Sequence, residues 1–315
     1  MTDLESKPEI SVIIPAYNRA HLLFRPLRSV LAQTFKRYEL IVVDDGSSDD
    51  TNEALEHWRE EFGDKMRTLR LNHAGVACAR NAGLAASRGR WAAFLDSDDE
   101  WLPNHLEAGR AAFDRQPAPG LVFTDHFIQS DRLIRTMVDL GGSEKEAIRR
   151  IILRKAVLLT TVVMIDRRVY ERLGGFDAAL RGTEDWEYWV RIALEYPVAH
   201  VPEATAIIHQ HPDNHSANPE KAEIQLAAAA RLIGRRGIGA YCSEAQVEAR
   251  AFLDSAEFYS WNGRTRKTLL QLCRAGASDP GLLLTRDALR ILARALLPLS
   301  VYRGLRDRVW RRPGS

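Results

Sequence analysis

Features that would point to a secreted or a dinucleotide-binding protein are missing from this sequence of 315 residues. Its only cysteines, Cys78, Cys242 and Cys273, are far apart and form no CxxC pair, so we expect a reducing compartment, no disulfides and no structural zinc. Met1 to Glu9 carries three acids and no apolar stretch, so no secretory signal is predicted. No GxGxxG follows the first predicted strand, which argues against an NAD-dependent enzyme.

A strong overall charge is also missing, because 44 basic residues nearly balance 42 acidic ones. A net charge of +2 says little about partners, and we expect no nucleic-acid partner. The distribution is uneven, since eight arginines against two aspartates give residues 281–315 a local charge of +6. Arginines interrupt the apolar residues of this tail too often for a membrane span of about 20 residues. Two alternatives remain: a basic amphipathic helix in peripheral contact with an anionic membrane, or a helix packed on the protein or on another subunit.

The first half of the chain alternates short apolar runs with helical patterns. Strands are predicted over 10–15, 39–43, 66–71 and 91–95, and helices over 21–33, 48–62 and 74–86. This order predicts an α/β fold whose mostly parallel central sheet is flanked by helices. Polar clusters follow the strands, at Asn18, Asp44–Asp45, Asn72 and Asp96–Asp99. Ligand sites in such sheets gather at the carboxyl ends of the strands.

The second half begins as a mixture and ends as helix. Strands are predicted over 121–127, 158–165 and 198–209, and helices over 143–153 and 184–195. A polar loop with two prolines follows, and the later helices are predicted over 221–232, 244–261, 264–275 and 284–297. We therefore predict a domain over 1–218 and a helical C-terminal extension over 219–315.

The sharpest chemical signal is the acidic segment Asp96-Ser97-Asp98-Asp99 directly after an apolar strand. Carboxylates this close repel one another unless a cation or hydrogen-bond donors neutralise them. Mg²⁺ and Mn²⁺ prefer oxygen ligands and share their coordination shell with substrate phosphates. The segment therefore predicts a metal that bridges a diphosphate; the alternative is a solvated turn before a helix.

Four motifs together resemble those of a family-2 inverting glycosyltransferase with the GT-A fold. They are Pro15–Asn18 (PAYN), Val42–Asp49 (VVDDGSSD), Ala79–Gly83 (ARNAG) and the acidic segment Asp96–Asp99. Each motif alone is weak, but four in the family's order are hard to reach by chance. The resemblance covers roughly residues 9–215 and implies the GT-A type of α/β fold.

The resemblance also implies a nucleotide pocket. Its residues are Pro15, Ala16, Tyr17, Asn18, Asp44, Asp45, Asn72, Arg80, Asp96 and Ser97. Tyr17 can offer a ring face to a base, Asp45 can accept a hydrogen bond from a uracil N–H, and Arg80 can neutralise a diphosphate. The alternatives are a turn cap for Asp44 and a surface salt bridge for Arg80.

By the same resemblance, Asp96, Asp98 and His211 hold Mn²⁺ or Mg²⁺. Transfer with inversion also needs a carboxylate that takes the acceptor's proton, and Asp185 is the candidate, with Glu184 beside the acceptor. The alternatives are that Glu184 and Asp185 only favour the helix dipole and that His211 is a surface residue. The helical spacing of Trp186 and Trp189 predicts core packing instead of an acceptor platform.

These observations predict transfer of a sugar from a nucleotide-diphosphate donor, a UDP-sugar, to a hydroxyl of a glycan or lipid-linked acceptor. The expected setting is polysaccharide or glycoconjugate synthesis in the cytoplasm, at the inner face of the membrane. One alternative is a GT-A protein that binds a nucleotide or glycan without catalysis. Another is a sugar-phosphate nucleotidyltransferase, which would need a Gly-rich phosphate loop where this chain has Pro15–Asn18.

Overall fold

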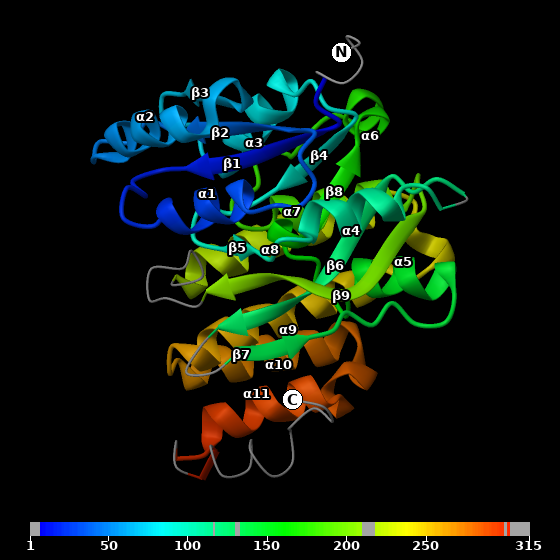
Figure 1. Ribbon diagram of the computed structural model, residues 1–315. Helices are drawn as coiled ribbons and strands as arrows, with labels where there is room; N and C mark the ends of the chain where they lie inside the picture. The colour runs from blue at the N-terminus through cyan, green and yellow to red at the C-terminus, as the bar shows by residue number, and fades with distance from the viewer. Residues whose placement is uncertain (1–6, 116, 130–132, 210–217, 299–300, 303–315) are drawn as a thin grey trace. The chain divides into compact units, whose positions relative to one another are not determined.

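The computed structural model describes residues 7–115, 117–129, 133–209, 218–298 and 301–302 (Figure 1). The chain divides into two compact units. The first combines Met1–Leu140 with Ala156–Gln210, and the second combines Gly141–Lys155 with His211–Ser315. A short internal segment, the one that carries helix α5, therefore belongs with the C-terminal helices, although the sequence alone suggested a single boundary near residue 218.

The first unit is built on one sheet in the order β3-β2-β1-β4-β8-β6-β9-β5, with β7 paired to β6. The strands are β1 (Ile10–Ala16), β2 (Tyr38–Asp44), β3 (Met66–Arg70), β4 (Trp91–Phe94), β5 (Glu100–Trp101), β6 (Leu121–Gln129), β7 (Leu133–Thr136), β8 (Val163–Asp166) and β9 (Val198–His209). β1 pairs in parallel with β2 and β4, and β2 with β3, which agrees with the predicted mostly parallel sheet. Every residue of β1 and β2 is buried, which is why these strands are mostly apolar, and their buried Ser11 and Glu39 are hydrogen-bonded to each other at 2.6 Å.

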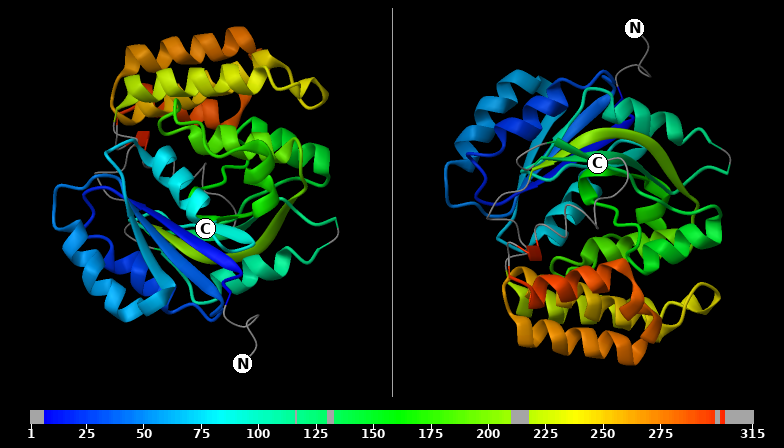
Figure 2. Two further views of the ribbon diagram at one scale, coloured as in Figure 1. Left: turned by 90° about the horizontal axis from the view of Figure 1, so that it is seen from above. Right: turned by 90° about the horizontal axis from the view of Figure 1, so that it is seen from below.

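Helices cover both faces of this parallel part. α1 (Phe24–Leu31) and α2 (Thr51–Phe62) lie on one face, and α3 (Val76–Ala86) lies on the other (Figure 2). The helices change face because the chain moves outward from β1 to β3 and then returns to place β4 on the opposite side of β1. The carboxyl ends of β1 and β4 therefore border a topological switch point, where ligands bind in such sheets.

The other part of the sheet is mixed. β8 pairs antiparallel with β4 and β6, while β6 pairs in parallel with β9 through two register shifts. Among the neighbouring helices are α4 (His105–Ala112), α6 (Arg167–Leu173) and α7 (Glu184–Ala193). The strand predicted from residue 158 begins only at Val163, after the 3₁₀ turn η2 (Thr160–Val162). The prediction missed β5, β7 and α6 because two to seven residues show too little periodicity.

An aromatic core fixes α7 against the sheet. Phe94 of β4, Phe176, Tyr188 and Trp189 form a set of rings with centroids 4.6 to 6.2 Å apart. Trp189 also donates a hydrogen bond from its indole nitrogen to the carbonyl of Leu158 at 3.0 Å. Trp186 and Trp189 are both buried, so their predicted core packing is confirmed. The start of α7 is held in place by this packing.

The second unit is helical. It contains α5 (Glu144–Ile152), α8 (Pro219–Gly234), α9 (Glu244–Trp261), α10 (Thr265–Ser278), the 3₁₀ turn η5 (Pro280–Leu284) and α11 (Arg286–Leu296). A capping box between Ser243 and Gln246 begins α9. Leu253, Leu272 and Ile291 belong to the apolar core shared by α9, α10 and α11.

Charged contacts also hold α11 to α9. Arg290 binds Glu257 at 2.9 Å, and the Arg294 guanidinium lies 3.6 Å from the centre of the Trp261 ring. The described part of the basic tail therefore packs within its own unit, in line with the second alternative raised above. Within the described ranges, no helix is both long and apolar enough to cross a membrane.

Candidate active site

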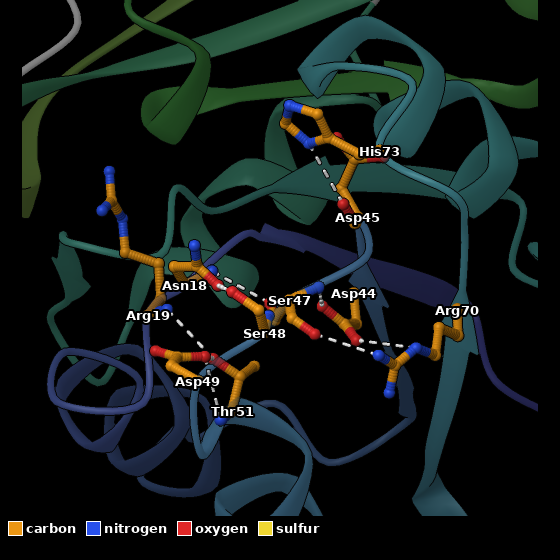
Figure 3. A network of polar contacts seen from close by, with 10 residues as sticks. All are labelled: Asn18, Arg19, Asp44, Asp45, Ser47, Ser48, Asp49, Thr51, Arg70 and His73. Atoms are coloured by element: carbon orange, nitrogen blue, oxygen red, sulfur yellow. Dashed lines mark hydrogen bonds and ion pairs between the residues drawn. The ribbon is translucent and has the colours of Figure 1, made fainter.

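The loops after β1 and β2 are tied to each other at the predicted nucleotide pocket (Figure 3). The backbone N–H of Asn18 donates to the Ser47 hydroxyl, and the Ser48 N–H donates to the Asn18 side-chain oxygen, both at 2.9 Å. Asn18 has φ +52°, a left-handed conformation that asparagine tolerates better than most residues. Pro15 and Ala16 are the last residues of β1 and are buried. The motif PAYN therefore ends one strand and fixes the loop of the next.

Asp44, the last residue of β2, and Asp45, which follows it, have different structural roles. Asp44 accepts a hydrogen bond from the Ser47 N–H at 2.9 Å and closes the turn, while Arg70 approaches it at 3.7 Å. Asp45 binds the loop before α3, accepting from the Ala74 and Gly75 N–H groups at 2.7 and 2.8 Å. The close approach of the loops also requires a glycine after Asp45, since Gly46 has φ +79° and a Cβ there would lie 2.9 Å from the His73 nitrogen.

A pair of stacked rings stands between these loops. The rings of Tyr17 and His73 lie 4.0 Å apart at an angle of 29°, and Tyr17 is 40% exposed. His73 comes directly after Asn72, and its Nδ1 lies 3.4 Å from an oxygen of Asp45. His73 follows shortly after strand β3, which is the signal that could have placed it in the predicted site. Its ring lies over one face of Tyr17, and the stacking of a base on Tyr17 stays a prediction.

The acidic segment after β4 is held by a hydroxyl and by the end of β9. The Thr161 side chain donates to Asp99 at 2.6 Å and accepts from the Asp96 N–H at 3.2 Å. Asp99 also accepts from the His209 N–H at 3.0 Å. Asp99 is buried, and this burial, reinforced by the charges of Asp96 and Asp98, raises the pKa of Asp99 well above its ordinary value. Asp99 therefore fixes the turn that presents Asp96 and Asp98.

Arg80 of α3 binds two of the predicted site carboxylates. It donates to an oxygen of Asp96 at 2.7 Å and to an oxygen of Glu184 at 2.9 Å. The other oxygen of Glu184 accepts from the Gly182 N–H at 2.6 Å. Arg80 is 5% exposed, its pair with Glu184 is buried and its pair with Asp96 is partly buried, so neither is the surface salt bridge considered above. The role of Arg80 toward a diphosphate stays a prediction.

The predicted base lies in the first turn of α7, next to Glu184. Asp185 is less buried than Glu184, and its Oδ1 accepts from the Trp186 N–H at 2.7 Å. The structure thus brings the turn of Asp96 and the start of α7 to the same arginine, although the two are almost 90 residues apart in sequence. Ser97 is buried between the two aspartates of the turn.

Only part of the predicted metal site lies within the described residues. His211 lies outside the described residues, and His209 binds Glu100 at 3.0 Å. Within the part of the chain that the structure describes, no three histidine, cysteine or acidic side chains gather as a metal site. Asp96 and Asp98 supply the hard oxygen donors that Mg²⁺ and Mn²⁺ prefer, and two carboxylates suit an ion that completes its shell with phosphates and water. The metal and the roles of these residues stay predictions.

The sequence matches Glycosyl transferase family 2 over residues 11–174, slightly more than half of the chain. The chain is 40% identical over 194 residues to the putative teichuronic acid biosynthesis glycosyltransferase TuaG of Bacillus subtilis, covering 59% of this chain and 72% of the relative. It is 44% identical over 100 residues to an Escherichia coli protein, UDP-Glc:alpha-D-GlcNAc-diphosphoundecaprenol beta-1,3-glucosyltransferase WfgD, covering 31% and 38%. The match spans less than two thirds of several curated relatives, for example 46% of a Nostoc glycosyltransferase.

Solved structures share the fold. Staphylococcus aureus TarS 1-349 in complex with UDP-GlcNAc has a TM-score of 0.63 at 21% identity, with 94% of this chain and 87% of that chain covered. The mannosyltransferase PcManGT from Pyrobaculum calidifontis, in complex with GDP-Man and Mn²⁺, has a TM-score of 0.61 at 18% identity, with 97% and 88% covered. The predicted α/β fold of GT-A type is therefore confirmed.

Proposed function

Because the chain belongs to Glycosyl transferase family 2, we propose that it transfers a sugar from a nucleotide-diphosphate donor, a UDP-sugar, to a hydroxyl acceptor with inversion. The observation that carries the proposal is the contact of Arg80 with both Asp96 and Glu184. It keeps the acidic turn close to the helix that starts with Glu184 and Asp185. A donor diphosphate at the turn and an acceptor hydroxyl at Asp185 then lie within one site.

In this proposal the donor binds across the ends of the parallel strands. The uracil lies on the exposed ring of Tyr17 beside His73 and Asp45, and the diphosphate extends toward Asp96 and Asp98. Loop residues already hydrogen-bonded to each other present a preformed surface, which lowers the entropy lost on binding. Relatives and neighbours named for UDP-Glc and UDP-GlcNAc support a UDP-sugar, whereas the neighbour with GDP-Man shows that the fold alone does not select the base.

Transfer itself needs a proton acceptor and stabilisation of the leaving diphosphate. Asp185 takes the proton from the acceptor hydroxyl while that oxygen attacks the anomeric carbon and the bond to the diphosphate breaks. Its position in the first turn of α7 favours the ionised form, since the helix N-terminus carries partial positive charge. Asp96 and Asp98 would hold Mn²⁺ or Mg²⁺, which supplies charge stabilisation for the departing diphosphate. His211 remains the proposed third ligand.

The acceptor and the setting are proposed from the relatives. A lipid-linked or glycan acceptor fits the names of WfgD and TuaG, and polysaccharide or glycoconjugate synthesis fits both. Peripheral membrane contact through the basic tail remains a further proposal. In its described part, Leu284, Leu289 and Leu296 are exposed, which is the apolar component such contact needs.

A thermal-shift screen tests the proposal. UDP, UDP-glucose and UDP-N-acetylglucosamine are added with MnCl₂ or with chelator, and release of UDP from each sugar nucleotide is measured. We expect a metal-dependent rise in Tm that is lost in Asp98→Ala, together with slow metal-dependent hydrolysis. Binding without any hydrolysis or transfer would favour the alternative of an inactive nucleotide-binding protein. Equal binding in chelator would contradict the metal role.

A further inference from the structure

Arg80 and Asn81 of the ARNAG motif both reach across to the chain segment that leads into α7. Asn81 binds the backbone of Phe176 twice, donating to its carbonyl and accepting from its N–H, both at 2.8 Å. A Cβ at Gly175 would lie 2.1 Å from the Asn81 side-chain oxygen, so the two segments are in close contact. The motif therefore anchors the segment before α7 by backbone recognition.

Arg80 then anchors the first residue of α7 itself. Its guanidinium lies 5.4 Å from the centre of the Phe176 ring, over the segment that Asn81 fixes. One terminal nitrogen binds Glu184, and the other binds Asp96. Because the guanidinium is planar and its donors have a fixed geometry, the two carboxylates are set at a fixed separation. Lysine, with one ammonium on a flexible chain, cannot reproduce this geometry.

The electrostatics favour the same arrangement. Burial alone lowers the pKa of Arg80, but the charges of Asp96, Glu184 and Asp185 outweigh it and raise the pKa above its ordinary value. The guanidinium therefore stays charged among these acids. Glu184 is 3% exposed, and both of its oxygens have partners, Arg80 and the Gly182 N–H. With both oxygens occupied, Glu184 is better placed to anchor α7 than to bind an acceptor.

We infer that Arg80 is a positioning residue, which places the base Asp185 relative to Asp96 by holding Glu184 beside it. The inference rests on the proposed function for the roles of Asp185 and Asp96. It assigns Glu184 to the anchoring of α7 instead of acceptor binding. It also gives the ARNAG motif a structural role besides any contact with the diphosphate. The motif connects Asp96, which we place at the donor, to the helix that carries the base.

The test is Arg80→Lys, which keeps the charge and changes the geometry. Hydrogen exchange of residues 176–187, the turnover number for hydrolysis of UDP-glucose or UDP-N-acetylglucosamine, and the Kd values for UDP and uridine are measured. We expect faster exchange in this segment and a kcat lower by about a hundredfold, since small misplacements of reacting groups have effects of that size. The ratio of the UDP and uridine Kd values in chelator should stay unchanged. Combining the variant with Glu184→Gln should add little further loss, because both act on one contact.

Arg67→Lys is the matched control. Arg67 also bridges a buried glutamate, Glu39, and a backbone carbonyl, that of Ala86, both at 2.6 Å. This variant should leave the exchange of residues 176–187 unchanged. Unchanged exchange in Arg80→Lys would overturn the inference, and selective loss of UDP affinity relative to uridine would make Arg80 a diphosphate ligand instead. If the wild-type protein neither binds UDP nor hydrolyses a donor, the proposed function fails, whereas hydrogen exchange still decides whether Arg80 holds α7.

Discussion

Two sides of the candidate site are held together in different ways. The nucleotide side comprises residues 17–18, 44–48 and 73–75, and the transfer side comprises Asp96–Asp99 with the start of α7. On the nucleotide side, side-chain oxygens bind backbone N–H groups of loops about 30 residues away. On the transfer side, buried carboxylates bind Arg80, Thr161 and the end of β9, at separations of up to 110 residues.

This difference has a physical consequence. Hydrogen bonds to backbone groups at the partly exposed loops can be replaced by water when one partner is lost. A buried charge that loses its partner has no such replacement, so its loss is more damaging. Substitutions on the transfer side should therefore affect rate and stability more than substitutions on the nucleotide side, which should mainly affect binding.

The largest effect is expected for Asp185→Asn on the transfer side. The amide cannot take a proton, so transfer or donor hydrolysis should fall by about 10² to 10⁴. The Kd for UDP in the presence of Mn²⁺ should stay within a factor of two or so of the wild-type value, because the base does not contact the nucleotide in our proposal. Measurement of both quantities checks this, and a loss of UDP affinity would give Asp185 a binding role.

A change of pH tests how a buried histidine, His105, affects the stability of the folded protein. His105 is buried, accepts or donates one hydrogen bond with Thr205 at 2.7 Å and stacks on Trp101. Burial lowers the pKa of His105 to about 3. Below pH 6.5 the unfolded chain binds a proton that the folded protein does not, so stability falls as the pH falls. Between pH 7.5 and pH 5 this costs about 2 kcal/mol of unfolding free energy.

Urea unfolding at these two pH values measures the effect. In His105→Gln the decrease in unfolding free energy between pH 7.5 and 5 should be smaller by about 2 kcal/mol than in the wild-type protein. His57→Gln, at an exposed histidine of α2, should keep the wild-type decrease. The same decrease in both variants would mean that His105 is protonated in the folded state.

On the nucleotide side, Asp45→Asn should have a smaller effect. The amide has only one acceptor oxygen for the N–H groups of Ala74 and Gly75, so the loop before α3 loosens. We expect UDP to bind about tenfold more weakly, which is about 1.4 kcal/mol. Calorimetry with UDP measures it. Asp49→Asn, at an exposed position of the same network, should change the affinity less, and equal losses would remove the special role of Asp45.

The smallest effect is expected for Tyr17→Leu. Loss of the aromatic face should weaken UDP binding by about 1 kcal/mol and leave the binding of inorganic pyrophosphate unchanged. Phe24→Leu, at another exposed aromatic residue, is the control that should bind UDP normally. If Tyr17→Leu weakened pyrophosphate binding equally, the ring would act on the loop and not on a base.

The sequence predicts the nucleotide side of the site better than the transfer side. The strands β1, β2 and β4 were predicted to within one residue or two, because each is a mostly apolar run followed by polar residues. The motif residues of the nucleotide side could be assigned to one site because they follow these strands. Thr161, Phe176 and Asn81 were not predicted as site residues, because each gains its role from a partner far away in the sequence.

The sequence by itself determined the α/β fold, the polar edge of the parallel strands and the family, because apolar periodicity and short motifs are local properties of the chain. Only the tertiary structure decided which carboxylates are held and by what. Arg80 reads as a phosphate ligand in its motif, yet in the folded protein it binds Asp96 and Glu184. This pairing depends on the crossover that brings α3 next to α7. A buried charge needs a partner, and the fold determines which group lies close enough to provide one.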